Sequence, residues 1–205
     1  MKLVQATLAA CIGSIGLVGS ASATTVATFA DPSTGPATPL FTFNAAAGTL
    51  TGGWSGLGLL LQTPAQLPSG TSYANAQFSM TPLGSIGNFG SIYHMGGGQI
   101  NFTTAGNAPL LTISFSDAWL TSSLGLGASD FMSNNVVFSG PILNGYTSVT
   151  NEAFSFSFAN PGTTTQFPGF TVTSSFTSSA DLVTPAPGAA ALLGLGGLLA
   201  ARRRR

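Results

Sequence analysis

Large apolar residues alternate with small polar ones through the middle of this 205-residue chain. The pattern is clearest at residues 154–158, where serines separate three phenylalanines, and it recurs at residues 41–43, 78–80, 100–102 and 111–115. A period of two places the apolar side chains on one face of an extended strand, whereas a helix needs a period near 3.6. The alternation therefore predicts half-buried β-strands and no long amphipathic helix in this part of the chain.

Further strands are expected at residues 49–53, 57–62, 135–139 and 169–177, with turns that contain glycine or proline between them. Many short strands separated in this way predict an all-β fold of two packed antiparallel sheets, a jelly-roll-like β-sandwich. We assign this body to residues 24–182, between a segment at 1–23 and a segment at 183–205. Residues 174–187 are interpreted as a Ser/Thr/Pro-containing stalk that connects the body to the last segment.

Acidic and basic residues occupy different parts of the sequence. The five bases are terminal and the five acids are internal, namely Lys2, Arg202, Arg203, Arg204 and Arg205 against Asp31, Asp117, Asp130, Glu152 and Asp181. A nucleic-acid-binding protein needs Lys or Arg to displace counterions from phosphates, and the body contains neither. Nucleic acid is therefore excluded as a partner. The single cysteine, Cys11, lies outside the body, which leaves the body without disulfide or thiolate chemistry.

The N-terminal segment has the features of a secretory signal peptide. Lys2 precedes an apolar stretch from residue 3 to residue 18, and small residues follow it at Ala21 and Ala23. This order predicts cleavage by signal peptidase after Ala23 and a mature chain that begins at Thr24.

The C-terminal segment combines a proline-bounded turn, an apolar run and a basic end. The turn contains Pro185, Ala186 and Pro187, the run covers residues 189–201, and four arginines follow. As a helix, the run is about 20 Å long, against a hydrocarbon core of about 30 Å. We therefore expect a short and weak membrane helix with its arginines in the cytoplasm.

This C-terminal segment resembles the PEP-CTERM sorting signal of Gram-negative bacteria, which an exosortase processes. The usual Pro-Glu-Pro is replaced here by Pro185-Ala186-Pro187, which is similar to the Pro-Ala-Pro variants of the signal. The resemblance covers only the sorting segment. It implies export, transient anchoring in the inner membrane, cleavage near Pro187, and a final location on the cell surface or in the extracellular exopolysaccharide.

Residues that could carry catalysis are few in the body. Asp117, Asp130 and Glu152 are candidates for a carboxylate pair, although each lies beside the end of a predicted strand, where an acid is usually a turn or capping residue. His94, the only histidine, could serve a Ser-His-Asp arrangement, but no Gly-x-Ser-x-Gly motif surrounds a serine and His94 is expected in a glycine-rich loop. These observations favour a protein that is not an enzyme, with a secreted hydrolase as the third hypothesis.

Ligand-binding candidates are weak for metals and better for sugars. No cofactor is predicted. A single imidazole is a poor basis for a zinc site, and calcium is the remaining metal, with oxygen ligands from Asp117, Asp130, Asn134 or Asn135 and from loop carbonyls. Trp54 and Trp119 are candidates for stacking against sugar rings, together with the three tyrosines, although both tryptophans adjoin predicted strands and would also suit a core. The sequence thus favours a non-catalytic, biofilm-associated matrix or envelope protein, and the alternative is a carbohydrate-binding module.

The sorting interpretation predicts the outcome of neutralising the arginine tail. Each arginine costs roughly 2.5–3.5 kcal/mol at the membrane centre, so replacing all four with neutral residues removes the barrier to translocation. We expect the variant to reach the periplasm or medium uncleaved, whereas wild-type protein ends near Pro187. Intact-mass measurement distinguishes the two products. Wild-type protein that keeps residues through Arg205 and stays in the inner membrane would contradict sorting.

Overall fold

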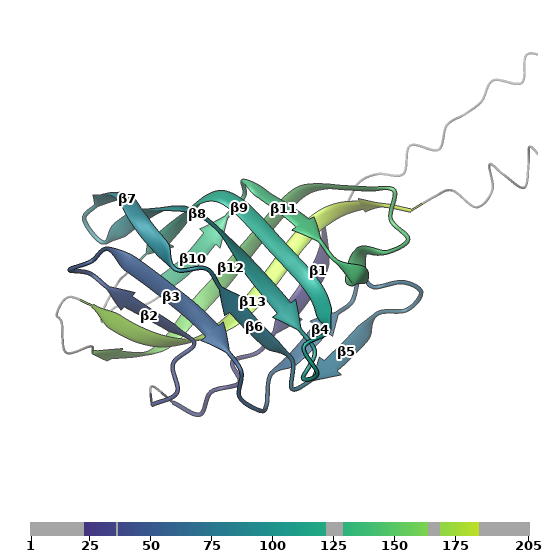
Figure 1. Cartoon of the computed structure of the whole chain (residues 1–205). Helices are drawn as coiled ribbons and strands as arrows, with labels where there is room; N and C mark the ends of the chain where they lie inside the picture. The colour runs from purple at the N-terminus through teal and green to yellow at the C-terminus, as the bar shows by residue number, and fades with distance from the viewer. Residues whose placement is uncertain (1–22, 36, 122–128, 164–168, 185–205) are drawn as a thin grey trace, which may run out of the picture.

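The computed structural model describes residues 23–35, 37–121, 129–163 and 169–184, and within these ranges the chain is all-β with no α-helix (Figure 1). The elements are β1 (Ala23–Phe29), β2 (Phe41–Asn44), β3 (Thr49–Trp54), β4 (Leu60–Thr63), β5 (Thr71–Ala74), β6 (Gln77–Met80), β7 (Leu83–Phe89), β8 (Ile92–Thr103), β9 (Pro109–Thr121), β10 (Ser129–Ser133), β11 (Val136–Ser139), the 3-10 helix η1 (Pro141–Leu143), β12 (Ser148–Thr163) and β13 (Phe170–Val183). The predicted all-β class is confirmed.

The strands form one antiparallel sheet that closes into an eight-stranded barrel. The strand order of the ring is β12-β10-β9-β8-β6-β3-β2-β13, and the pairing of β13 with β12 closes it. β13 is long enough to use one edge twice, for β2 at Val172 and for β1 at Phe176. The strands β1, β4 and β5 therefore continue the sheet outward from β13 as a branch.

Phenylalanine rings from strands on opposite sides of the barrel meet in its interior. We call these two opposite sides of the barrel its walls. Phe156 of β12 lies 4.9 Å from Phe41 of β2 and 5.9 Å from Phe78 of β6, as measured between ring centroids, although these strands are not neighbours in the sheet. Phe102 of β8 and Phe176 of β13 approach in the same way, at 4.9 Å. The barrel is thus filled by side chains from both walls, and its interior is a packed core.

The expected jelly-roll sandwich of two separate sheets is corrected by this closure. In a sandwich, the edge strands of one sheet do not pair with those of the other. Here β12 and β13 pair along most of their length and join the two walls. The cross-barrel packing of rings nevertheless resembles the inner layer of a sandwich. The difference arises because the terminal strand pairs on both of its edges.

The strands expected from alternation are present, and several others were not predicted. β1, β5, β7 and β10 had no counterpart among the expected strands. Two expectations were wrong: residues 174–183 of the expected stalk form the second half of β13, and His94 lies in β8 instead of a loop. β13 continues past residue 177 because its backbone pairs with β1 and β12.

The terminal segments fall mostly outside the described ranges. Ala23 and Thr24, on either side of the predicted cleavage point, lie at the start of β1, whereas Ala21 and the rest of the signal segment lie outside. The sorting residues Pro185, Ala186 and Pro187, the apolar run and the arginines also lie outside. Among the residues that are described, no helix has the length and apolar character needed to cross a bilayer.

The ring packing predicts that Phe156 is a major contributor to stability. Phe156 is fully buried, and its replacement by Ala leaves a cavity between the walls that should cost about 3–5 kcal/mol in free energy of unfolding. The matched control is Phe89→Ala, because Phe89 is 86% exposed and its loss should change stability by less than about 0.5 kcal/mol. Urea denaturation measures both variants. Equal costs at the two positions would contradict the packing described here.

Candidate functional site

An exposed tryptophan and the only histidine form a stacked pair on the outside of the barrel. Trp119 of β9 and His94 of β8 lie directly opposite each other in the antiparallel pairing. Their rings are nearly parallel, at 8°, with 4.3 Å between centroids. Trp119 remains 46% exposed although His94 covers part of its ring. The pair presents an aromatic surface to solvent in a fixed orientation.

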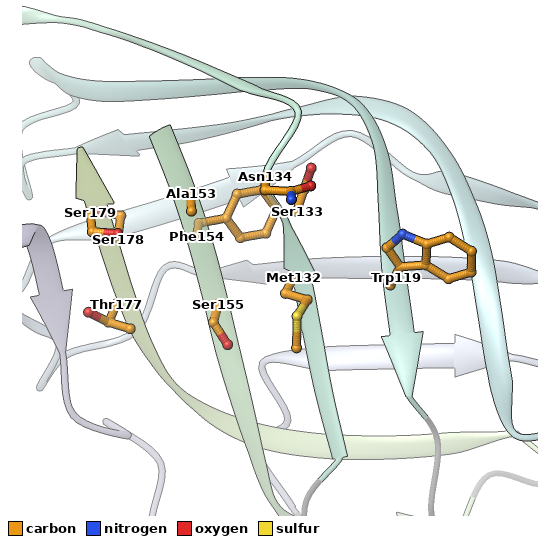
Figure 2. Close-up of a pocket in the computed structure, with 10 residues that line it drawn as sticks. All are labelled: Trp119, Met132, Ser133, Asn134, Ala153, Phe154, Ser155, Thr177, Ser178 and Ser179. Carbon is orange, nitrogen blue, oxygen red and sulfur yellow. The ribbon is translucent and has the colours of Figure 1, made fainter. Parts of the chain in front are cut away.

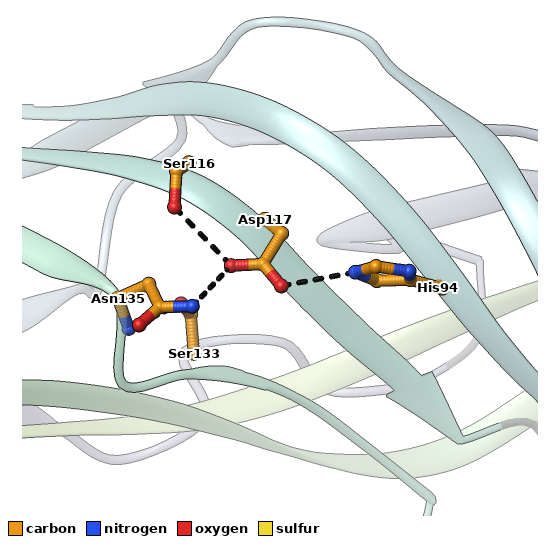
Figure 3. Close-up of polar contacts among 5 residues, drawn as sticks. All are labelled: His94, Ser116, Asp117, Ser133 and Asn135. Atoms are coloured by element: carbon orange, nitrogen blue, oxygen red, sulfur yellow. Dashed lines mark hydrogen bonds and ion pairs between the residues drawn. The ribbon is translucent and has the colours of Figure 1, made fainter.

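A carboxylate holds the histidine of this pair in place (Figure 3). His94 Nε2 lies 2.9 Å from Asp117 Oδ2, and because an ionised carboxylate only accepts hydrogen bonds, Nε2 donates. Asp117 Oδ1 accepts from Asn135 Nδ2 at 2.7 Å and from Ser116 Oγ at 3.3 Å. Asn135 lowers the pKa of Asp117 most, followed by the hydrogen bond from His94. The carboxylate is thus held ionised between two strands and the turn before β11.

These side chains face outward because the strands change phase next to them. On β9, residues 111, 113 and 115 are buried, but beyond Ser116 the buried positions become 118 and 120. β8 makes the same change at Gly97. A Cβ at Gly97 would lie 2.8 Å from the carbonyl oxygens of Phe115 and Ser116, so only glycine allows this close approach. Without the change of phase, Asp117 and Trp119 would point into the core.

Trp119 also forms one end of a shallow groove of about 390 Å³ across β9, β10, β12 and β13. Figure 2 shows its labelled side chains on these neighbouring strands and on the turn after β10. The groove is lined by Trp119, Met132, Ser133, Asn134, Ala153, Phe154, Ser155, Thr177, Ser178 and Ser179, all of them uncharged. Hydroxyl and amide groups therefore lie beside an aromatic ring and an exposed methionine, an arrangement suited to a neutral polar ligand.

The other predicted aromatic candidates are used in packing. Trp54 is only partly exposed, packs against the core, and has its indole nitrogen enclosed. Tyr73 donates its hydroxyl hydrogen bond to Gln66, Tyr146 donates to the Ala65 carbonyl, and Tyr93 packs against Phe43. Of the two tryptophans proposed for sugar stacking, Trp119 therefore has the more accessible ring.

The catalytic candidates meet only in part. Asp117, Asp130 and Glu152 lie on β9, β10 and β12, and only Asp117 contacts His94. Ser116 hydrogen-bonds to Asp117, so the three residue types of a hydrolase triad are connected in the order Ser–Asp–His. A triad requires the serine to contact the histidine, and this arrangement does not supply that contact.

The calcium candidates meet at a single contact, between Asp117 and Asn135. That contact is made by the amide nitrogen of Asn135 and not by its oxygen. Within the described ranges, no group of three or more His, Cys, Asp or Glu side chains could hold a metal ion.

The stacking of His94 on Trp119 and its contact with Asp117 were not predicted, although the sequence contains a signal for them. The expected strands at 100–102 and 111–115 form a hairpin in which Ile100 pairs with Ile113. Continuing that register by six residues places His94 opposite Trp119. The three glycines at 96–98 predict a loop, but β8 continues through them to Ile92.

Comparison of the chain with protein-family models, with curated proteins and with solved structures gives no match. The candidate site therefore rests on the geometry described above.

The network around Asp117 predicts a titration effect for Asn135→Ala. Loss of the amide donor should raise the pKa of Asp117 toward its ordinary value of 3.8, as measured by carbon NMR of the carboxyl group against pH. Because the folded pKa is lowered, the stabilisation by this network is present above the ordinary pKa and is lost as pH falls through the lowered value. Asn134→Ala is the control, and an unchanged pKa in Asn135→Ala would refute the assignment.

Proposed function

We propose that this chain is an exported, non-catalytic protein of the cell envelope or extracellular matrix that binds glycan through the outer face around Trp119. In this proposal, signal peptidase and an exosortase process the two ends, the inner membrane holds the protein transiently, and exopolysaccharide is its partner. The body then serves as a binding element of the matrix. This combines the structural role expected from the sequence with its carbohydrate-binding alternative.

The exposed and oriented ring of Trp119 is the observation that carries the proposal. Sugar rings present apolar C–H faces that pack against flat aromatic surfaces, and a ring that is already fixed loses little conformational freedom on binding. His94 fixes Trp119 by stacking, and Asp117 fixes His94. Two residues, His94 and Asp117, thus support one exposed ring, which is more than packing of an isolated surface tryptophan requires.

The polar groups beside Trp119 support a sugar ligand over a purely apolar one. Sugar hydroxyls both donate and accept hydrogen bonds, and so do the hydroxyls of Ser155 and Thr177 and the amide of Asn134 in the same groove. The body has no Lys or Arg to attract phosphate. A ligand with many neutral hydroxyl groups matches this surface in both polarity and charge.

The proposal predicts that Trp119→Ala loses glycan binding. Wild-type protein should be retarded on at least one gel containing a neutral polysaccharide, such as cellulose, β-1,3-glucan or galactomannan, because the indole stacks against sugar rings. The variant should bind at least about tenfold more weakly, equivalent to about 1.4 kcal/mol. Affinity electrophoresis measures the retardation.

Two control variants separate the role of Trp119 from that of any exposed aromatic residue. Phe89→Ala removes an exposed ring on β7, outside the groove, and should leave retardation unchanged. Trp119→Phe keeps a smaller ring and should retain intermediate binding. Migration of wild-type protein unaffected by every neutral gel would count against glycan binding.

A further inference from the structure

The groove at Trp119 is part of a longer row of outward side chains. Each member lies directly opposite the next in the pairing of neighbouring strands from β9 to β4. The row consists of Trp119, Met132, Ser155, Thr177, Thr28 and Gln62. It crosses the strands at a right angle, so it follows the hydrogen-bonding direction of the sheet.

A second hollow lies at the far end of this row. Gln62, Thr71 and Ser72 line it together with residues of the turn between β4 and β5, and its volume is about 430 Å³. Gln62 pairs with Ser72 on β5, and both side chains are exposed. The first hollow ends at Thr177, and Thr28 alone separates Thr177 from Gln62 in the row. One line of side chains therefore connects the two hollows.

From this alignment we infer that the ligand is an extended chain of an uncharged polysaccharide that lies across the strands from Trp119 to Gln62. The inference rests on the proposed function and adds the length, direction and charge of the ligand. Five strand spacings of about 4.8 Å give the row a length of about 24 Å, enough for several consecutive sugar rings. Trp119 binds one ring by stacking, and the hydroxyl and amide groups bind the following rings.

The charge of the surface selects an uncharged chain. All six residues of the row are neutral, and the described part of the chain contains acids but neither Lys nor Arg. Asp130 pairs with Ser157, which lies two residues from Ser155 of the row on β12. Asp117 lies two residues before Trp119 on β9. A polysaccharide that carries carboxylates would be repelled by these acids with no Lys or Arg to compensate.

A peptide partner fits this surface less well than a glycan does. Extended peptides bind by adding a strand to an exposed sheet edge. The row crosses strands whose backbones already pair with neighbours on both sides, so side chains, and not backbone groups, are offered to the ligand. Ligand binding here depends on contacts with hydroxyl and C–H groups, which a glycan supplies at every ring.

The test compares neutral oligosaccharides of increasing length by isothermal titration calorimetry with the full-length protein. The probes are the series from disaccharide to hexasaccharide of β-1,4-glucose, β-1,3-glucose and β-1,4-mannose, with oligogalacturonides as the acidic series. Affinity for at least one neutral series should rise about tenfold or more from disaccharide to hexasaccharide, and the acidic series should bind at least about tenfold more weakly.

The variants Gln62→Ala and Thr71→Ala, both at the hollow farthest from Trp119, should remove most of this rise and leave disaccharide binding unchanged. Thr51→Ala is the matched control, because Thr51 is an exposed threonine on β3, a strand outside the row, and its loss should have no effect. Thermal unfolding of each variant verifies that the fold is intact.

Different outcomes identify which idea fails. If the disaccharide and the hexasaccharide bind with equal affinity and Gln62→Ala changes neither affinity, the extended site is overturned, while a site at Trp119 stands. Equal binding of acidic and neutral chains overturns the charge selection. Absence of binding by all neutral series, together with no effect of Trp119→Ala on gel retardation, overturns the proposed function and this inference with it.

Discussion

The packing of phenylalanine rings between the two walls of the barrel is the interaction on which the rest of the structure depends. The described body contains no cysteine, Lys or Arg, so neither disulfides nor ion pairs of Lys or Arg contribute to its stability. Apolar burial must therefore provide most of the stability, at roughly 1.5–3 kcal/mol for each buried phenylalanine. Because the inner face carries this role, the outer face is free to present the neutral Ser, Thr and Asn side chains that a binding surface uses.

Exposure of the candidate site depends on a second constraint, the close approach of β8 and β9 at Gly97. The alternation of residues 111–115 alone would place Trp119 inside the barrel, so alternation could not have predicted an exposed tryptophan. Residue type alone makes Trp119 a candidate, and the hairpin register places His94 opposite it. The change of phase that turns both outward depends on a backbone contact at a residue with no side chain, and such a contact leaves little signal in a pattern of apolar residues.

The strands were predictable where large residues occupy successive inward positions, and they were missed where such residues are few or small. β2, β6 and the middle of β12 have Phe or Met at every inward position, which gives the alternation directly. β13 buries Ser174 and Ser178 instead; its strand is expected only as far as residue 177, and residues 174–187 are expected to form a stalk. The Ser178 hydroxyl donates to the Ala27 carbonyl and accepts from the Ala27 amide. Closure of the barrel depends on this strand, so the sequence pattern predicted the strands but not the ring that they form.

The position of the row relative to the ends of the body bears on when it could bind. Ala23 pairs with Asp181, so the start of β1 and the end of β13 lie together at one end of the barrel. Thr177 precedes Val183 by six residues of strand, which places the row about 20 Å from the point where β13 ends. In the proposed sorting scheme, the membrane lies beyond that end, and the row crosses the strands at a distance from it. A glycan chain could then occupy the row before cleavage as well as after it, so release from the membrane and attachment to the matrix need not occur in a fixed order.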